Sequence, residues 1–355
     1  MKKILLSTIL LCLILVFTVG CEGETSENGS SAANGVVHVH NWGEFIDMDV
    51  LNMFEREYGI RVIYNTYATN QALYSQLQMG TIVADVVVPS DYMIARLISE
   101  DMLYELNFDN IPNYTLIDPR FRNLDFDPDN RFSVAYMTGT VGIIYNTAFI
   151  DEPITSWSAL FDERFAGQIL MFDNPRDAFG VALKYLGFSQ NTTNEDEIMQ
   201  AFELLVQQRD ILQAYVMDQI FDLMESGDAW IAPYYMGDFL WMHETNPDLA
   251  FAIPVEGTNA FVDAMVIPRG APNRENAELF INFMARTDIA LMNMSAIMYS
   301  SANYQSAALY AEEIEPWKYE IMFPSPEVMD RTEVFTHLPQ HILDLYDRLW
   351  VELKS

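Results

Sequence analysis

The chain has 355 residues, half of them hydrophobic, which provides for a substantial core over a length that suggests two domains. Its formal net charge of -32 at pH 7 argues against nucleic acid or an anionic membrane surface as a partner, because both carry negative charge themselves. Such a charge concentrates cations near the surface, but general acidity for solubility explains it equally well, so the charge alone identifies no ligand.

The first 20 residues have the order of a secretory signal peptide. Lys2 and Lys3 precede an apolar run over residues 4–19, and the small residue Gly20 stands directly before Cys21. A small residue followed by cysteine resembles a bacterial lipobox, in which the cysteine thiol receives diacylglycerol. The run is shorter than the roughly 20 residues that a membrane-spanning helix needs. We therefore expect cleavage after residue 20, lipidation of Cys21, and a protein held at the cell membrane or in the periplasmic space, outside the cytoplasm.

Residues 21–35 are small or polar after the cysteine, with no large apolar side chain. Such a segment cannot bury enough surface to offset its conformational entropy, so we expect a flexible tether. The only other cysteine, Cys12, lies in the signal. The mature chain would then have no free thiol for a disulfide, a zinc site or a catalytic nucleophile.

From residue 36 the hydrophobic pattern alternates between strands and helices. The first set comprises strands at 36–42, 61–67 and 84–88, a helix at 47–58 that Gly59 ends, and a helix capped by Asn70. This order predicts an α/β unit around a mostly parallel sheet. A second set comprises strands at 142–145, 169–172 and 231–235, and helices at 178–186, 195–208 and 340–353. Two α/β lobes are therefore expected.

Aromatic and acidic residues follow several of these strands, where ligands bind in open α/β sheets. They are Trp42, Glu44 and Phe45 after the first strand, Asp91 and Tyr92 after Ser90, Asp173 and Asp177 around Asn174, and Tyr234, Tyr235, Phe261, Asp263 and Tyr299 further along. Each residue alone is more typical of packing, a turn or a helix cap. The repeated pairing of ring and acid indicates a site.

Rings and carboxylates together suit a particular ligand. An aromatic face attracts an alkylammonium group by roughly 0.5 to 2 kcal/mol. A carboxylate is needed as well, because a buried unpaired ammonium group is too costly. The pattern therefore predicts binding of a slender organic cation.

Several segments resemble a known family in both sequence and order. They are 41–45, 64–67 with Asn70, 87–92, 155–157 with Leu160, 173–177, and 276–286 with Asp288. Together they resemble the spermidine/putrescine-binding proteins of polyamine ABC transporters, from about residue 37 to the C-terminus. The resemblance implies a two-lobed periplasmic-binding-protein fold with the ligand in a cleft between the lobes. We place one lobe at 36–140 plus 262–307 and the other at 141–261 plus 308–355.

The resemblance also implies roles for individual residues. An aromatic box would surround the methylene chain, Asp177 and Asp263 would receive ammonium groups, and polar contacts would complete the site. The expected ligand-binding residues are Trp42, Glu44, Phe45, Ser90, Asp91, Tyr92, Asn174, Asp177, Tyr235, Phe261, Asp263 and Tyr299. Asn174 stands where the family usually has an acid, and Met217 and Phe335 replace polar residues, so the preferred polyamine is left open.

The implied mechanism needs no cofactor or metal. A polyamine would enter an open cleft, the lobes would close on it, and the closed form of a monomeric binding protein would deliver it to a membrane permease. Three other readings stay open: ferric-ion binding by Tyr234 and Tyr235 or metal chelation by His38 and His40, an extracellular enzyme with Asp173 and Asp177 as paired acids, and binding of another small cation or an oligosaccharide. No H-E-x-x-H, G-x-S-x-G or P-loop pattern is present, so we expect no enzyme.

Overall fold

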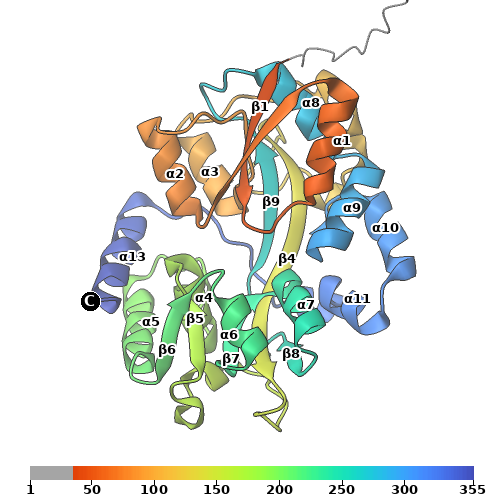
Figure 1. Cartoon of the computed structure of the whole chain (residues 1–355). Coiled ribbons are helices and arrows are strands. Elements are labelled where there is room, and N and C mark those ends of the chain that lie inside the picture. The colour runs from red at the N-terminus through yellow and green to blue at the C-terminus, as the bar shows by residue number, and fades with distance from the viewer. Residues whose placement is uncertain (1–34) are drawn as a thin grey trace, which may run out of the picture. The chain divides into compact units, whose positions relative to one another are not determined.

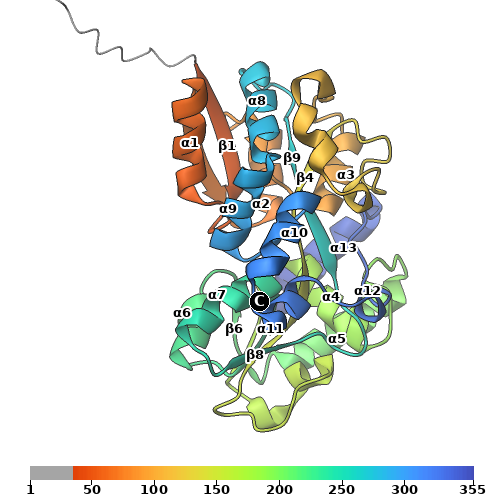
Figure 2. The same ribbon diagram turned by 90° about the vertical axis from the view of Figure 1, so that its right-hand side faces the viewer.

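Two long strands run through the centre of the structure, a computed structural model that describes residues 35–355 (Figure 1). β4 (Ser133–Asn146) pairs antiparallel with β9 (Ala260–Val266) over residues 133–140. Over residues 141–146 it pairs instead with β7 (Ile231–Tyr235) and β8 (Leu249–Ala252), again antiparallel. β4 therefore connects two groups of elements, which lie toward its two ends in both views (Figures 1 and 2).

The first group is built on three parallel strands, β1 (Val36–Trp42), β2 (Arg61–Tyr67) and β3 (Val86–Val87). Its helices are α1 (Met48–Tyr58), α2 (Asn70–Met79), α3 (Asp91–Ser99), α8 (Arg274–Met284), α9 (Thr287–Ile297) and α10 (Tyr304–Glu313). The short strand β10 (Ser300–Ser301) pairs with β4.

The second group is built on β5 (Ile169–Phe172), which pairs parallel with β6 (Leu212–Val216) and with β7. Its helices are α4 (Pro175–Tyr185), α5 (Glu195–Gln208), α6 (Ile220–Ser226), α7 (Met236–Thr245), α11 (Pro316–Met322), α12 (Pro326–Met329) and α13 (Gln340–Leu353). The full strand order is β2-β1-β3-β9-β4-β7-β5-β6.

The prediction of a mostly parallel sheet is confirmed within each group and wrong at the centre. There β3, β9, β4 and β7 pair antiparallel. The pattern at 142–145 covers only the last part of β4, a strand that is buried on both faces along nearly its whole length.

Local sequence explains most element boundaries. The side chain of Asp47 accepts a hydrogen bond from the backbone of Asp49 at the start of α1, and Gly59 ends that helix in the left-handed conformation, with φ 65°. The predicted cap at Asn70 is wrong, because Thr69 caps α2 by accepting from the backbone of Ala72. This leaves the amide of Asn70 free for contacts elsewhere.

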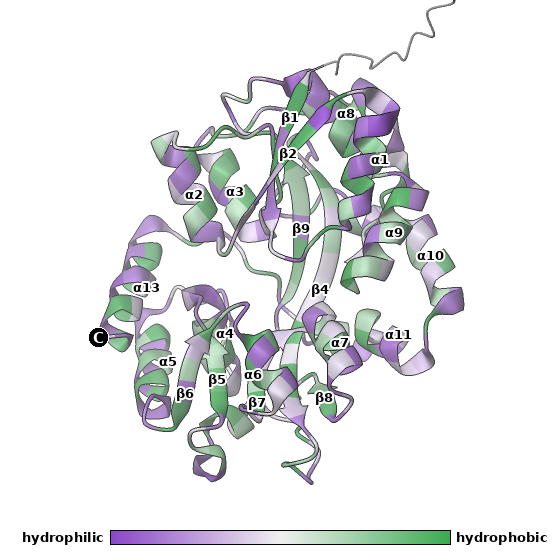
Figure 3. Cartoon of the chain, in the orientation of Figure 1, coloured by the Kyte–Doolittle hydropathy of each residue, from purple (hydrophilic) through white to green (hydrophobic). Residues whose placement is uncertain are grey.

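Apolar side chains gather along the strands between the helices. Figure 3 shows β5 in green, and all four of its side chains are buried. α13, which was predicted with the bounds that the structure shows, buries one face through Ile342, Leu345 and Leu349. No helix of residues 35–355 has both the length and the apolar character to cross a bilayer. The signal, Cys21 and nearly all of the tether lie outside the described residues.

Candidate functional site

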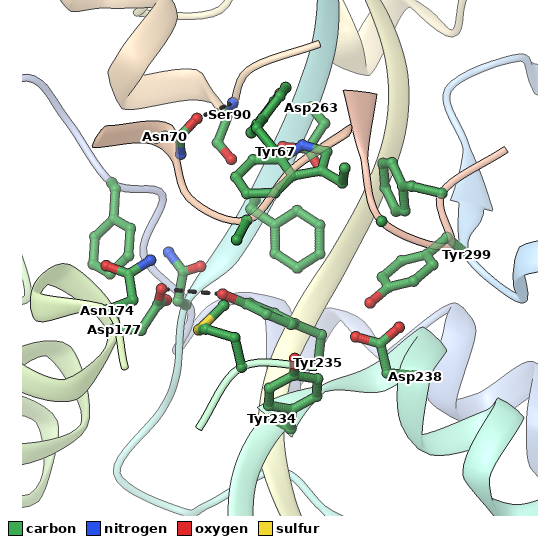
Figure 4. A pocket seen from close by; sticks show the side chains of 18 of the residues that line it. Tyr67, Asn70, Ser90, Asn174, Asp177, Tyr234, Tyr235, Asp238, Asp263 and Tyr299 are labelled. Atoms are coloured by element: carbon green, nitrogen blue, oxygen red, sulfur yellow. Dashed lines mark hydrogen bonds between the residues drawn. The ribbon is translucent and has the colours of Figure 1, made fainter. Parts of the chain in front are cut away.

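A cavity of about 90 Å³ lies where the strand ends of the two groups meet (Figure 4). Its wall combines nine aromatic rings with five carboxyl groups. The rings are Trp42, Phe45, Tyr67, Tyr92, Tyr234, Tyr235, Phe261, Tyr299 and Phe335, and the acids are Asp91, Asp177, Asp218, Asp238 and Asp263. Within residues 35–355, no Lys, Arg or His side chain lines the cavity.

The fold explains why these residues converge. Trp42 ends β1, and Ser90 stands between β3 and α3. In the second group, Asp177 lies in the first turn of α4, just after β5, and Tyr235 ends β7. Carboxyl ends of parallel strands lie at one edge of a sheet, and here two such edges face each other across β4 and β9.

The rings touch one another around the cavity. Phe45 and Tyr299 meet edge to face with ring centroids 4.9 Å apart, and Tyr235 and Phe261 do so at 5.6 Å. Phe261 and Tyr299 lie 6.1 Å apart and connect the two pairs. The contacts are within the range in which aromatic pairs stabilise each other, so the box is preformed.

Burial dominates the electrostatics of the acids. It raises the pKa of Asp263 to about 8, because the carboxyl group is only 4% exposed and the negative charges of Asp91 and Asp177 act in the same direction. Ser90 donates a hydrogen bond to this carboxyl group, but one oxygen of Asp263 has no partner within the described residues. Asp263 is one of the residues that line the cavity.

Two more acids resemble Asp263 in this respect. Burial raises the pKa of Asp238 to about 7, against the opposing effect of a hydrogen bond from Tyr299. It raises the pKa of Asp177 to about 6, although the hydroxyl of Tyr235 donates to Asp177 Oδ2 at 3.1 Å (Figure 4). Each group would be more easily ionised with a cation beside it.

The family profile of bacterial extracellular solute-binding proteins matches residues 49–324. This chain belongs to that family. A Spermidine/putrescine-binding periplasmic protein of Salmonella typhimurium is 31% identical over 311 residues, which cover 86% of this chain and 89% of the relative.

Solved structures agree with the assignment. A putative spermidine/putrescine ABC transporter structure from Listeria monocytogenes is 36% identical, with a TM-score of 0.85, and covers 90% of this chain and 99% of its own. The TpPotD lipoprotein of Treponema pallidum is 27% identical, with a TM-score of 0.81 and the same coverage. The predicted two-lobed fold of periplasmic binding proteins is thus confirmed.

The cavity of this solute-binding protein contains every residue predicted for the site except one. Glu44 is exposed, has a positive φ of 49°, and is not among the lining residues, because the turn after β1 directs Phe45 and not Glu44 inward. Asp91 lines the cavity, but its two oxygens accept from the backbone of Tyr92 at 2.7 Å and of Val262 at 3.1 Å. It therefore ties the start of α3 to β9.

Asn174 also has a structural task. Its side chain accepts from the backbone of Arg176 at 3.1 Å and so caps α4, which places Asp177. On the opposite wall, Asn70 donates to the hydroxyl of Tyr92 at 3.0 Å and accepts from the backbone of Ser90 at 3.3 Å. The amide freed by the Thr69 cap thus orients two lining residues.

Sequence reasoning missed Tyr67, Asp218, Asp238 and Asn259 as lining residues. A signal existed for Asp238, which follows Tyr235 by three residues at the start of α7, so both side chains share one face. Asp218 and Asn259 lie in connections with no comparable pattern. Tyr67 was recognised only as the end of a strand.

The structure weakens two of the alternative readings. Burial raises the pKa of Tyr234 and Tyr235 well above the usual range, which opposes the phenolate form that ferric ion requires. Asp173 is not a lining residue and forms an ion pair with Lys354, so it is no catalytic partner of Asp177 in the cavity. His40 is buried, and its Nε2 atom lies 3.0 Å from the carbonyl oxygen of Val83, so this nitrogen is engaged by the protein, which opposes metal chelation together with His38.

Proposed function

We propose that this chain captures a polyamine of the putrescine or spermidine type outside the cytoplasmic membrane and delivers it to an ABC permease. The observation that carries the proposal is the cavity itself, an aromatic box lined by five carboxyl groups, all buried or half-buried except the exposed Asp218, and by no cationic side chain of residues 35–355. The names of the relatives point to the same ligand class.

A polyamine can interact favourably with both the aromatic rings and the carboxyl groups of the cavity wall. Its methylenes bury apolar surface against the rings, while its ammonium groups offset the repulsion and desolvation that raise the pKa of the acids. An oligosaccharide would use the rings but would leave the carboxyl groups without counter-charge. The unpaired oxygen of Asp263 is the proposed acceptor for one ammonium group, and Asp177 is the proposed acceptor for another.

The two acids come from different groups of elements, which suggests how binding closes the protein. Asp177 belongs to the second group, whereas Asp263 lies on β9, where that strand pairs with the first part of β4. A ligand that contacts both acids favours the closed arrangement, in which the two acids are near each other. It shifts the balance between the open and closed arrangements only by the difference between its affinities for them. The lobe boundaries given above belong to this proposal.

The proposal also includes a lipid anchor at Cys21 and a location at the cell membrane or in the periplasmic space. We propose further that the protein acts as a monomer and is not an enzyme. The word lipoprotein in the description of the Treponema relative supports the anchor. Metabolic labelling with a fatty acid, compared between the wild-type chain and a Cys21→Ala variant, tests it. Labelling that persists in the variant would exclude lipidation at this cysteine.

Calorimetry tests the ligand class directly. Putrescine and spermidine should bind the purified protein, and N-acetylputrescine, which has lost one positive charge, should bind at least tenfold more weakly. Maltotriose and ferric citrate serve as tests of the sugar and iron readings. Heat from either of these in the absence of any response to the polyamines would refute the proposal.

A further inference from the structure

A second cavity, of about 50 Å³, is lined by the buried residue Arg176. Its wall comes from α2, α3, α4, α13 and the segment before α13, and Tyr92 lines both cavities. Figures 1 and 2 place α13 beside α4 and α5 of the second group, with the first group on its other side. The second cavity is therefore bounded by elements of both groups.

Arg176 is the unusual residue of this cavity. It is 3% exposed, and its Nε and Nη1 atoms have no hydrogen-bond acceptor among residues 35–355. Only its Nη2 atom has a partner, the side-chain oxygen of Asn191 at 3.1 Å. A buried charge with two unused donors is strongly unfavourable without a compensating group.

The protein compensates this charge only in part. The guanidinium lies over the ring of Phe335 at 4.5 Å and farther from Tyr92 and Tyr346, but rings accept hydrogen bonds poorly. The positive charge also opposes the burial that raises the pKa of Asp91 and Asp177, yet neither acid forms a salt bridge with Arg176. Tyr346 is also in the wall, and its hydroxyl has no hydrogen-bond partner in the described part of the chain either.

The other charged groups of the wall do not neutralise the charge of Arg176. Arg96 forms a salt bridge with Glu100 at 2.9 Å, and His337 is exposed. Asp347 is the one acid in the wall, and it is exposed and in no ion pair within the described chain. Among the described residues, Arg176 is thus the one arginine of the wall without a carboxylate in a salt bridge, and Asp347 is the one carboxylate. The volume suffices for a few water-sized groups.

We propose that this second cavity binds a small inorganic anion, with chloride as the reference ligand, through Arg176 Nε or Nη1 and the hydroxyl of Tyr346. Such an anion contacts elements of both groups. It therefore stabilises the same closed arrangement as a ligand in the aromatic cavity, and the two affinities rise together. The binding of the anion itself does not depend on the function proposed above, whereas the coupling does.

Bromide, which scatters X-rays anomalously, tests the site. Crystals of the protein grown in sodium bromide should show an anomalous peak within hydrogen-bond distance of Arg176 in the wild-type chain. The peak should be absent in Arg176→Gln and retained in Arg131→Gln, a change at an exposed arginine remote from the cavity. A cavity that holds only water, or an Asp347 side chain turned onto Arg176, would overturn the proposal.

Calorimetry of putrescine binding tests the coupling. At constant ionic strength, replacing gluconate, which is too large for the cavity, by chloride should strengthen binding about fivefold in the wild-type and Arg131→Gln proteins. Arg176→Lys keeps the charge and the fold but not the donor geometry, and its affinity should no longer respond to chloride. Equal affinities in the two salts for the wild-type protein would refute the coupling even where bromide is seen.

Discussion

At the scale of single residues, Asp263 has the surroundings that most strongly favour a cationic neighbour. Its carboxyl group is buried on a central strand, and one of its oxygens has no hydrogen-bond donor in residues 35–355. A ligand ammonium group at this oxygen would bind across a low-dielectric environment, where charge pairs are strong. A substitution at Asp263 therefore measures the contribution of this carboxyl group to ligand affinity separately from that of the rings.

We expect Asp263→Asn to weaken putrescine binding by about 100-fold or more, because truncating one partner of a buried charge pair costs about 2 to 5 kcal/mol. Calorimetry at pH 8 gives the affinity. The folded protein without ligand should be no less stable than the wild type, since the substitution removes a disfavoured charge. Asp173→Asn, at an acid outside the cavity, is the control and should leave the affinity unchanged. An unaltered affinity in Asp263→Asn would contradict the assignment.

The raised pKa values also predict how binding depends on pH. Burial raises the pKa of Asp177, Asp238 and Asp263 to about 6, 7 and 8, so the free protein holds protons that an arriving ammonium group displaces. Polyamine affinity should therefore rise between pH 6 and pH 8, with release of protons. Calorimetry in buffers of different ionisation enthalpy measures that release. Binding without proton release over this range would show that these acids do not meet the ligand.

The same three acids make the stability of the ligand-free protein change with pH in the opposite direction to the polyamine affinity. Between the usual aspartate pKa of about 4 and the raised values, the folded protein binds more protons than the unfolded chain. The stability of the ligand-free protein should therefore fall as pH rises from about 4 to 8, and saturating putrescine should diminish that fall. Thermal unfolding with and without ligand over this range is the measurement. A steeper loss of stability in the presence of putrescine would be the contrary result.

At the scale of elements, glycines make room for the rings of the box. A Cβ atom at Gly139 on β4 would come within 2.8 Å of Phe261, its cross-strand neighbour on β9. A Cβ atom at Gly142, on the same strand, would instead meet Phe251, which does not line the cavity. Crowding at Gly139 should therefore disturb a ring of the ligand site, whereas crowding at Gly142 should disturb only the packing of the strand.

Gly139→Ala should displace Phe261 and weaken polyamine binding about tenfold, with a stability loss of about 1 to 3 kcal/mol from overpacking. Gly142→Ala is the matched control, and should lose at least as much stability while its folded molecules keep the wild-type affinity. Denaturant unfolding and calorimetry on both variants provide the comparison. Equal losses of affinity in both would mean that the strand as a whole, rather than the ring, governs binding.

At the scale of the whole molecule, the net charge of -32 acts over distances that no single contact spans. The field of an acidic protein raises the encounter rate of a cation and is screened within about 8 Å at physiological salt. We therefore expect the association rate of spermidine to fall about tenfold between 0.01 M and 0.15 M salt, with a smaller change in the dissociation rate. Stopped-flow fluorescence of Trp42 and the other tryptophans measures both. A salt effect confined to dissociation would contradict this steering.

Local patterns in the sequence were sufficient to predict about half of the strands and helices, and to indicate that rings and acids gather near the strand ends. Alternation and helical periodicity depend on neighbours within a few residues, and so does the tendency of rings and acids to follow strands. For this reason β1, β2, β5, α5 and α13 were predicted with the bounds that the structure shows. The class of solute-binding protein was predicted from the resemblance of several segments to a known family.

Only the tertiary structure decided which of these strand ends meet. The antiparallel pairing of β4 with β9 and β7 joins residues far apart in sequence, and no local pattern specifies such a partner. That pairing brings Asp238 into the wall and leaves Glu44 outside, and it buries Arg176 between the two groups. The reason is physical: burial and charge repulsion depend on the three-dimensional neighbours of a side chain, and these are set by long-range packing.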